Sequence, residues 1–339
     1  MPLMQGLDLG FKMDAQDKQC GFVGQYFGRC ADPSLMNSRY CFWHDPDVGK
    51  TSTGVRTLLE TRARSGIPME GFQLRRANLG NIDLVNHDGE PYRLVGSDLS
   101  RANLSRAHLY RVDFSGSNLM KADLSQANLH HGCLSRCNLL GSNLKGTRIE
   151  HVDWGDRFLQ EEKAGEALQK GQEKEAVMWY QEAEEVSRNI RKSCESQGLF
   201  AIAGNFFYRE VVFRRYRYPR WSWARFISKM VDLISGYGEK PLRVVGFSMV
   251  LIFFCSLFYF LFGVLDGGQL VKFEAGQPIS SNLLNWLDTL YFSVVTFTTL
   301  GYGDLTPVGL SRVIAAVEAF TGSFTLALFV VVFVKKMTR

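Results

Sequence analysis

The chain has 339 residues, with 39 Lys or Arg and 34 Asp or Glu, so its net charge is only +5. The hydrophobic fraction of 46% is ordinary, but long apolar runs are concentrated after residue 240. Residues 244–265 carry no charge, and residues 313–334 carry only Glu318. At about 1.5 Å per residue, either run forms a helix of roughly 33 Å, long enough to cross a bilayer. This distribution excludes a simple soluble enzyme and predicts a membrane protein with a large water-soluble part.

Residues 1–50 are expected to form a small separate module. No secretory signal is expected at residues 1–13, because they lack an apolar core and a cleavage site. Three cysteines and one histidine follow with the spacing C-x9-C-x10-C-x2-H: Cys20, Cys30, Cys41 and His44. Three thiolates and one imidazole suit tetrahedral zinc, and a metal would stabilise a segment too small for a large core. We therefore predict a structural zinc site, with ordinary buried thiols and redox sensing as alternatives.

A repeat with a period of five residues fills residues 72–155, after a linker at residues 51–71 that is expected to contain a short helix. A large apolar residue, usually Leu, recurs at every fifth position, and only Gly89 interrupts this column. Two residues earlier in each repeat stands a mostly small residue. A period of five fits neither an α-helix nor a β-strand, but it fits a square coil with one repeat on each side.

The repeat unit, as in Ala102-Asn103-Leu104, resembles the A-(D/N)-L-x-x pattern of pentapeptide-repeat proteins. The resemblance implies a right-handed quadrilateral β-helix of about four coils, roughly 20 Å tall. It is less informative about function. Some such proteins mimic DNA, which needs an acidic surface, but residues 72–154 carry ten basic and eight acidic residues. We therefore expect no nucleic-acid partner and a role as scaffold, spacer or gating module, with residues 85–93 as an irregular side that offers a contact surface.

Residues 156–215 are expected to form a helical linker between the repeats and the membrane part. Small and aromatic residues recur in it at a spacing that resembles tetratricopeptide-type helix packing, from Gly171 to Tyr180 and again from Gly198 to Phe207. One or two such units are weak evidence for peptide binding. A cap on the β-helix that also serves as a rigid arm is the favoured interpretation.

Residues 216–238 are expected to form an amphipathic helix at the membrane interface. The segment is basic and aromatic at its start, and after Pro219 apolar and charged residues fall on opposite helix faces. Such helices bind anionic lipid headgroups. The residues predicted at the interface are Arg217, Arg220, Trp221, Trp223 and Arg225. The helix would convey movement of the repeat domain to the first span, with a passive anchor as the alternative.

Between the two spans, residues 289–301 form a third apolar stretch that is too short to cross a bilayer, which favours a re-entrant or core-packed helix. It leads into the sequence Thr298-Thr299-Leu300-Gly301-Tyr302-Gly303-Asp304. A permeant cation needs oxygen ligands in place of its water, and a ring of backbone carbonyls supplies them if some residues adopt positive φ. Glycine does so without steric cost, and Gly301 and Gly303 alternate with other residues.

This segment resembles the T-V-G-Y-G filter signature of potassium channels, with Leu300 in place of Val. The order of span, pore helix, filter and span across residues 241–339 also matches. The resemblance implies a tetramer with K⁺ bound in the filter, a gating hinge at Gly322, and the following residue roles. Filter residues are Thr299, Leu300, Gly301, Tyr302 and Gly303, and supporting residues are Thr298, Asp304 and Glu318. Close helix packing at Gly322, and a position of Glu318 near the outer interface, remain alternatives.

Basic residues flank the outer ends of the two spans and are scarce between them, so the positive-inside rule predicts a multi-pass protein of the cell membrane with both termini in the cytoplasm. Seven cysteines in that compartment are expected to be thiols or metal ligands. No catalytic constellation stands out, so no enzyme is expected.

The predicted fold is multidomain: a quadrilateral β-helix, a helical linker and an all-α two-span pore domain. The predicted function is a tetrameric, potassium-selective channel whose repeat domain is a regulatory or assembly module, with K⁺, membrane lipids and further copies of the chain as partners. The alternative is a membrane-tethered repeat scaffold with a non-conducting pore. The sequence does not indicate a gating stimulus.

Overall fold

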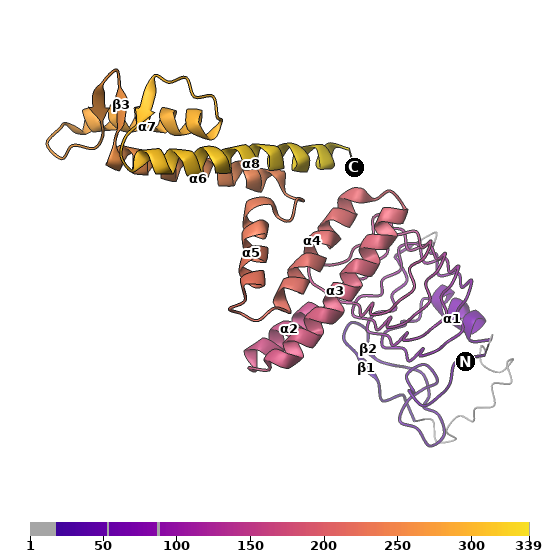
Figure 1. Ribbon diagram of the computed structural model, residues 1–339. Coiled ribbons are helices and arrows are strands. Elements are labelled where there is room, and N and C mark those ends of the chain that lie inside the picture. Colours follow the sequence, from indigo (N-terminus) through magenta and orange to yellow (C-terminus); the bar gives the residue numbers. More distant parts are fainter. Residues whose placement is uncertain (1–17, 53, 87–88, 339) are drawn as a thin grey trace. The chain divides into compact units, whose positions relative to one another are not determined.

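The computed structural model describes residues 18–52, 54–86 and 89–338 (Figure 1). The expectation of no signal at residues 1–13, and the part of the irregular side at His87 and Asp88, lie outside the described residues. The chain divides into two compact units, Met1–Tyr218 and Pro219–Arg339. The division falls next to Pro219, three residues beyond the expected end of the linker at residue 215.

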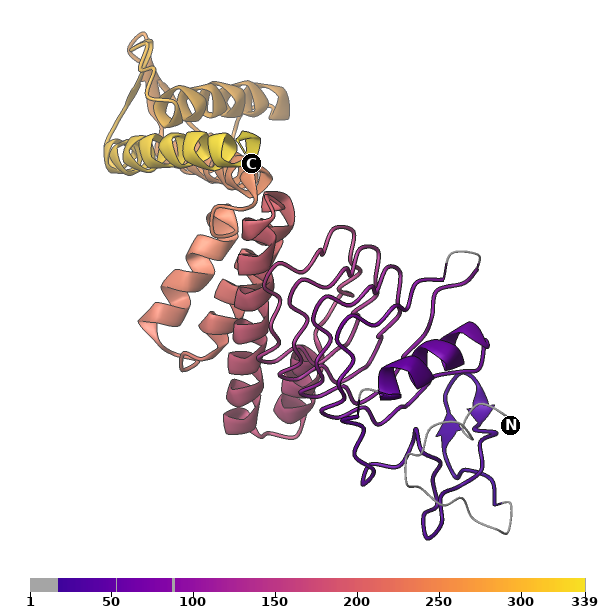
Figure 2. The same ribbon diagram turned by 90° about the vertical axis from the view of Figure 1, so that its right-hand side faces the viewer.

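The five-residue repeat folds into the predicted square coil, visible in Figure 2. Parallel bridges join residues that lie one coil apart, from Arg93↔Asp113 to Cys133↔Asp153, so a coil contains four repeats. The recurring large residue, such as Leu124, and the small residue two places earlier are buried and fill the narrow core. In every repeat from Leu94 to Ile149, the residue two places after the large one is left-handed and turns the chain at the corner, whether it is Gly116 or the non-glycine Lys121.

The first coil is longer than the others, which the repeat pattern did not reveal. Its bridges, such as Gln73↔Asp98 and Asp83↔His108, join residues 25 apart. The additional chain lies between Leu84 and Leu94, which are both buried. Because the extra length equals one repeat, every later large residue keeps its inward direction despite the interruption at Gly89.

The N-terminal module closes the first coil. It contains a hairpin whose two strands, β1 (Val23–Gly24) and β2 (Gly28–Arg29), are each two residues long. Helix α1 (Gly54–Arg64) follows the module in the chain. The Trp43 ring stacks on Phe72 with 4.9 Å between centroids, and the Trp43 carbonyl accepts a hydrogen bond of 2.8 Å from the Gln73 amide. The segment expected to be a linker is packed into the core through α1, whose Leu59 is fully buried.

Helices close the other end of the coil, as Figure 2 shows. They are α2 (Leu159–Gln169), α3 (Glu173–Ser196) and α4 (Phe200–Tyr216). The Asn189 amide of α3 donates to the Ser142 carbonyl at 2.7 Å, and the Ser193 hydroxyl donates to the Leu144 carbonyl at 3.1 Å. These bonds saturate polar groups of the last coil, as a cap on a repeat domain must.

Two buried carboxylates join α3 to α4. Glu210 accepts hydrogen bonds from Arg188 at 3.0 Å and Arg191 at 2.9 Å, and Glu184 lies beside it in the same network. Buried carboxylates are tolerated when several donors satisfy them, which Arg does with a rigid fork of N–H groups. The network therefore fixes how the two longest helices of this unit pack.

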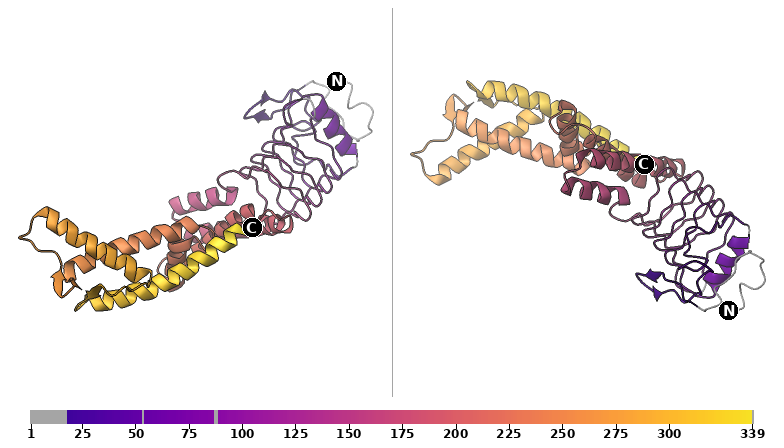
Figure 3. Two further views of the ribbon diagram at one scale, coloured as in Figure 1. Left: turned by 90° about the horizontal axis from the view of Figure 1, so that it is seen from above. Right: turned by 90° about the horizontal axis from the view of Figure 1, so that it is seen from below.

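The second unit contains two helices among the described residues, α6 and α8, that are long and apolar enough to cross a membrane by length and composition. They pack against each other and against α7, as seen in Figure 3. A three-stranded antiparallel sheet in the order β4-β3-β5, which was not expected in a pore domain described as all-α, joins the end of α6 to the start of α8. The elements are α5 (Trp223–Ser235), α6 (Pro241–Phe262), β3 (Val264–Asp266), β4 (Gln269–Val271), α7 (Ile279–Phe297), β5 (Leu305–Pro307) and α8 (Ser311–Met337).

Replacing Glu210 with Gln is expected to destabilise the first unit by about 2 kcal/mol at neutral pH, because hydrogen bonds to a charged group are stronger than neutral ones. Burial alone would raise the pKa of Glu210, but hydrogen bonds from Arg191 and Arg188 outweigh it and hold the pKa below its ordinary value of 4.5. The stabilisation is therefore complete above the unfolded-state pKa and is lost as the pH falls through the lower folded-state pKa.

Thermal unfolding of the full-length protein, followed by tryptophan fluorescence, measures the difference. Trp154 reports on this unit because its ring contacts Phe206 of α4 at 5.5 Å between centroids. Glu185→Gln removes an equal charge from the exposed side of α3 and serves as the control. Equal melting temperatures for the two variants at neutral pH, or a difference that persists unchanged in acid, would contradict the prediction.

Candidate functional site

The backbone leaves the helical conformation directly after α7. Thr298 ends the helix, and its hydroxyl donates to the Val294 carbonyl at 2.8 Å. From there φ is positive at Thr299 (59°), Gly301 (57°) and Gly303 (82°), while Leu300 and Tyr302 keep ordinary values. The glycines were expected to supply this alternation, but the left-handed Thr299 was not. A β-branched residue is strained in this conformation and adopts it only where its surroundings impose it.

This alternation gives the segment its chemical capability. When positive and ordinary φ values alternate along a chain, successive carbonyl oxygens point toward the same side. Several oxygens can then replace the water around a cation. A Cβ at Gly301 or Gly303 would meet no atom within 4 Å, so these positions need glycine for backbone conformation and not for space. Within a single chain, Leu300 is 59% and Tyr302 is 67% exposed.

A hydrogen bond ties the far end of this segment to the helix before it. The Tyr291 hydroxyl on α7 donates to the Asp304 carboxylate at 2.7 Å, and the other carboxylate oxygen accepts from the Leu305 amide at 2.9 Å. Residues 298–303 are therefore held at both ends. The sequence indicated Asp304 by its place after Gly303, but no local pattern paired it with Tyr291, which lies 13 positions earlier.

Glu318 of α8 contacts both α6 and α7. It is 1% exposed, and its carboxylate accepts hydrogen bonds from Tyr259 of α6 at 2.6 Å and from Ser293 of α7. An ionisable group inside an apolar helix is tolerated only where such partners satisfy it. Sequence analysis identified Glu318 but missed Tyr259 and Ser293, whose only signal was a polar group within an apolar stretch.

Gly322 lies where α8 meets the end of α7. A Cβ at this position would stand 2.1 Å from the carbonyl oxygen of Phe297, far inside contact distance. Only the absence of a side chain allows the two backbones to approach so closely. This contact supports the packing role that was kept as the alternative, and the gating hinge remains a prediction.

Helix α5 presents apolar side chains on its surface. The Ser222 hydroxyl caps it by accepting from the Ala224 amide at 3.2 Å. Trp221 and Trp223 are 98% and 78% exposed. Large aromatic residues with this exposure are typical of a membrane-interface segment.

The predicted interface residues do not all lie together. Arg220 and Trp221 precede α5, and Arg225 lies within it beside Trp223. Arg217 belongs instead to the first unit, where its guanidinium forms an ion pair of 3.0 Å with Glu184. Its guanidinium is thus paired with a buried carboxylate of α3, and its place at the lipid surface remains a prediction.

Ion pairs connect α5 and the turn after it to α6 and α8. Arg243 at the start of α6 pairs with Asp232 of α5 at 2.6 Å. Lys335 at the end of α8 pairs with Glu239 in the turn between α5 and α6. The start of α6 and the end of α8 are therefore tied to the same short stretch of chain, residues 232–239.

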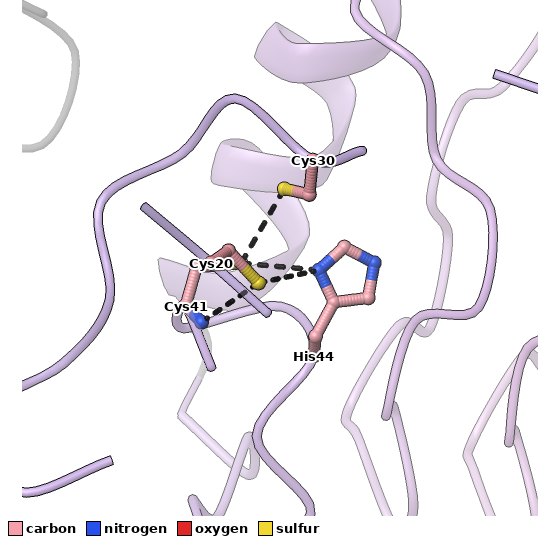
Figure 4. Close-up of side chains that lie close together, drawn as sticks. All are labelled: Cys20, Cys30, Cys41 and His44. Atoms are coloured by element: carbon pink, nitrogen blue, oxygen red, sulfur yellow. Dashed lines mark hydrogen bonds between the residues drawn. The ribbon is translucent and has the colours of Figure 1, made fainter. Parts of the chain in front are cut away.

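The four predicted metal ligands come together in the first unit, as shown in Figure 4. One ligand atom from each of Cys20, Cys30, Cys41 and His44 lies within 4.8 Å of every other. Cys30 is partly exposed and the other three are buried. Hydrogen bonding from Cys41 lowers the pKa of Cys30 to about 3, helped by His44 and opposed by burial. Such a group of soft donors can hold a metal ion.

Comparison with protein families assigns two parts of the chain. The model described as "Ion channel" matches residues 246–339, which include most of α6, all of α7, residues 298–304 and α8. The model described as "Pentapeptide repeats" matches eight copies within residues 93–126 and 122–153. Both matched families are non-enzymatic, and each match lies where the structure shows the corresponding architecture.

Individual proteins are similar to parts of this chain. Potassium channel subfamily T member 1 of Mus musculus is 41% identical over 78 residues, which are 22% of this chain and 6% of that protein. Protein LctB of Geobacillus stearothermophilus is 46% identical over 91 residues, 26% of this chain and 58% of that protein. A pentapeptide repeat protein from the cyanobacterium Cyanothece is 32% identical, with a TM-score of 0.21, over 23% of this chain and 50% of that chain.

The chain therefore spans less than two thirds of each of these relatives, and the matches concern its domains and not its whole length. The ion-channel family model covers the C-terminal part of the chain, and the pentapeptide-repeat model covers its middle part. The chain is a fusion of an ion-channel domain of the potassium-channel type with a domain of pentapeptide repeats.

Proposed function

We propose that the chain is the subunit of a tetrameric, potassium-selective channel of the cell membrane. The observation that carries the proposal is the alternating backbone of residues 299–303, directly after the C-terminal end of α7. One chain supplies one side of such a filter, so four chains are needed to surround an ion. The high exposure of Leu300 and Tyr302 in the single chain agrees with this, because neighbouring chains would cover them.

Each supporting residue has a defined role in this proposal. Thr298 ends the pore helix, Asp304 anchors the outer end of the filter through Tyr291, and Glu318 holds the pore helix between the spans. The free carbonyl groups at the C-terminal end of α7 carry partial negative charge, which favours a cation beyond Phe297. K⁺ would move passively down its gradient.

The proposed orientation places both termini in the cytoplasm. Arg243 lies at the start of α6, and Lys335 and Lys336 lie at the end of α8. The repeat domain would then be cytoplasmic, and it reaches the pore through α5. Because Glu239 and Asp232 pair with the ends of both spans, movement of α5 can be transmitted to α6 and α8. We assign the repeat domain a regulatory or assembly role on this basis.

Gly301→Ala tests the filter. An alanine at positive φ costs about 1–2 kcal/mol, and four chains carry the change, so K⁺ flux into liposomes is expected to fall more than about a hundredfold. Gly276→Ala is the matched control, because Gly276 also has open space around a Cβ but does not have positive φ. It is expected to conduct like the wild type, and Na⁺ flux should stay low for both.

Two outcomes of the flux measurement would contradict potassium-selective conduction. One is wild-type flux that does not distinguish K⁺ from Na⁺. The other is the absence of flux in wild-type protein that native mass spectrometry shows to be an intact tetramer, which would favour the membrane-tethered scaffold with a non-conducting pore. A stable monomer or dimer in the membrane would refute the tetramer.

Gly322→Ala separates packing from hinge bending. If close packing dominates, the new Cβ pushes α8 away from Phe297 and lowers the melting temperature and the yield of tetramer. Gly246→Ala, on α6 with open space around it, is expected to be neutral or slightly stabilising because alanine favours a helix by about 1 kcal/mol. A Gly322→Ala protein as stable as the wild type, with only its open probability changed, would instead support the hinge.

Lys335→Gln and Glu239→Gln test the connection between α8 and α5. Each removes the same ion pair, so each is expected to shift the open probability in one direction, and the double variant should shift it no further. A pair worth about 1 kcal/mol changes the ratio of open to closed channels about fivefold. Lys336→Gln, at the exposed neighbouring position, controls for loss of charge. Additive shifts in single-channel recordings would argue against this connection.

A further inference from the structure

The four side chains at the N-terminal end have the dimensions of a tetrahedral metal site. The sulfurs of Cys30 and Cys41 lie 3.9 Å apart, and Nδ1 of His44 lies 3.6 Å from the Cys20 sulfur and 3.2 Å from the Cys41 sulfur. In a zinc tetrahedron with ordinary bond lengths, neighbouring sulfurs lie about 3.8 Å apart and sulfur and nitrogen about 3.6 Å apart. A disulfide would require the two sulfurs to lie about 2 Å apart.

The surroundings of His44 leave the correct ring nitrogen available. Nε2 lies 2.8 Å from the backbone carbonyl of Glu70. A carbonyl only accepts, so Nε2 carries the proton and the lone pair of Nδ1 faces the three sulfurs. Phe22 stacks on the imidazole with 4.0 Å between centroids and fixes the ring plane. A hydrogen bond donated by the ring nitrogen that does not bind the metal is a regular feature of metal-binding histidines.

The thiolates are also accommodated. The Cys41 amide donates to the Cys20 sulfur at 3.3 Å, which favours a sulfur that carries charge. Asp32 lies 3.7 Å from the Cys30 sulfur, and the buried Arg62 pairs with Asp32 at 2.8 Å, which offsets the negative charge of that carboxylate beside a thiolate. The segment around these residues has short β-strands and little apolar core of its own.

The site is built into the contact with the β-helix. Trp43 lies in the sequence between two of the candidate ligands, Cys41 and His44. Its ring stacks on Phe72, and its carbonyl accepts the hydrogen bond from the Gln73 amide. We infer that Cys20, Cys30, Cys41 and His44 bind one Zn²⁺ ion, and that this ion holds the N-terminal cap closed over the first coil. Three thiolates and one imidazole are the donors that select zinc among the common divalent ions.

Elemental analysis of full-length protein purified without chelator tests the inference. About one zinc per chain is expected in the wild type, and Cys20→Ser and Cys41→Ser should reduce it to less than about 0.2. Cys133→Ser is the matched control, because Cys133 lies on the outside of the β-helix away from the site. It should retain the full zinc content.

A second measurement does not depend on variants that can fail to fold. Wild-type protein exchanged with Co²⁺ is expected to show the absorption of tetrahedral cobalt together with a sulfur-to-metal charge-transfer band. The inference is overturned by wild-type protein with less than about 0.2 zinc per chain, by iron in place of zinc, by octahedral cobalt spectra, or by intact mass spectrometry that finds a Cys30–Cys41 disulfide.

Amide hydrogen exchange tests the role of the ion in the cap. Removal of zinc by a chelator is expected to speed exchange at least tenfold in residues 18–52 and at Gln73, whose amide donates to Trp43. Coils beyond Arg93 should be unaffected, because they are bonded to one another and not to the module. Unchanged exchange near Gln73 after the zinc has been removed would refute the role in closure.

Discussion

The membrane part depends on holding a short stretch of non-helical backbone within a helical bundle. Residues 299–303 alternate between positive and ordinary φ values, and within this described stretch only the amides of Thr299 and Leu300 bond back to carbonyls of α7, so the conformation of the segment must be imposed by contacts around it. Glu318 fixes α7 between α6 and α8, Gly322 lets α8 approach the carbonyl of Phe297, and Asp304 is held by Tyr291. The three-stranded sheet joins the ends of the spans beyond this segment. These contacts are hydrogen bonds or an unusually close approach of two backbones, and apolar side-chain packing alone provides neither.

The domain of pentapeptide repeats faces a different constraint, because a repeating coil has two open ends. The two ends are closed by different chemistry. At one end, α3 donates side-chain hydrogen bonds to carbonyls of the last coil, and its packing on α4 is fixed by buried carboxylates and arginines. At the other end, a short segment with little core of its own brings Trp43 onto Phe72 beside a cluster of sulfur and imidazole donors. Long helices are enough to close the end of the coil at α3 and α4, whereas a small module needs local cross-links to close the other end.

Periodicity and apolar length predicted the architecture well, because both are local properties of the sequence. The period of five gave the square coil, and two apolar runs gave α6 and α8. The spacing of Cys20, Cys30, Cys41 and His44 predicted a cluster that the fold does bring together. Pairings between distant residues were not predictable in this way. Tyr259 and Ser293 reach Glu318 only once three helices are packed, and Arg217 reaches Glu184 only once α4 folds onto α3. The strained Thr299 was missed because threonine by itself disfavours positive φ.

The square coil has a geometric consequence for how this chain can change in length. Five added residues inserted as a bulge, like those between Leu84 and Leu94, leave the direction of the rest of the coil unchanged. Five residues added as a true side would instead move the departure point of α2 by about a quarter turn around the coil axis. Four such additions would restore the original heading at a greater height. The number of repeats therefore sets, in quarter-turn steps, the side of the coil from which α2 departs. This effect does not require any change within the helices themselves.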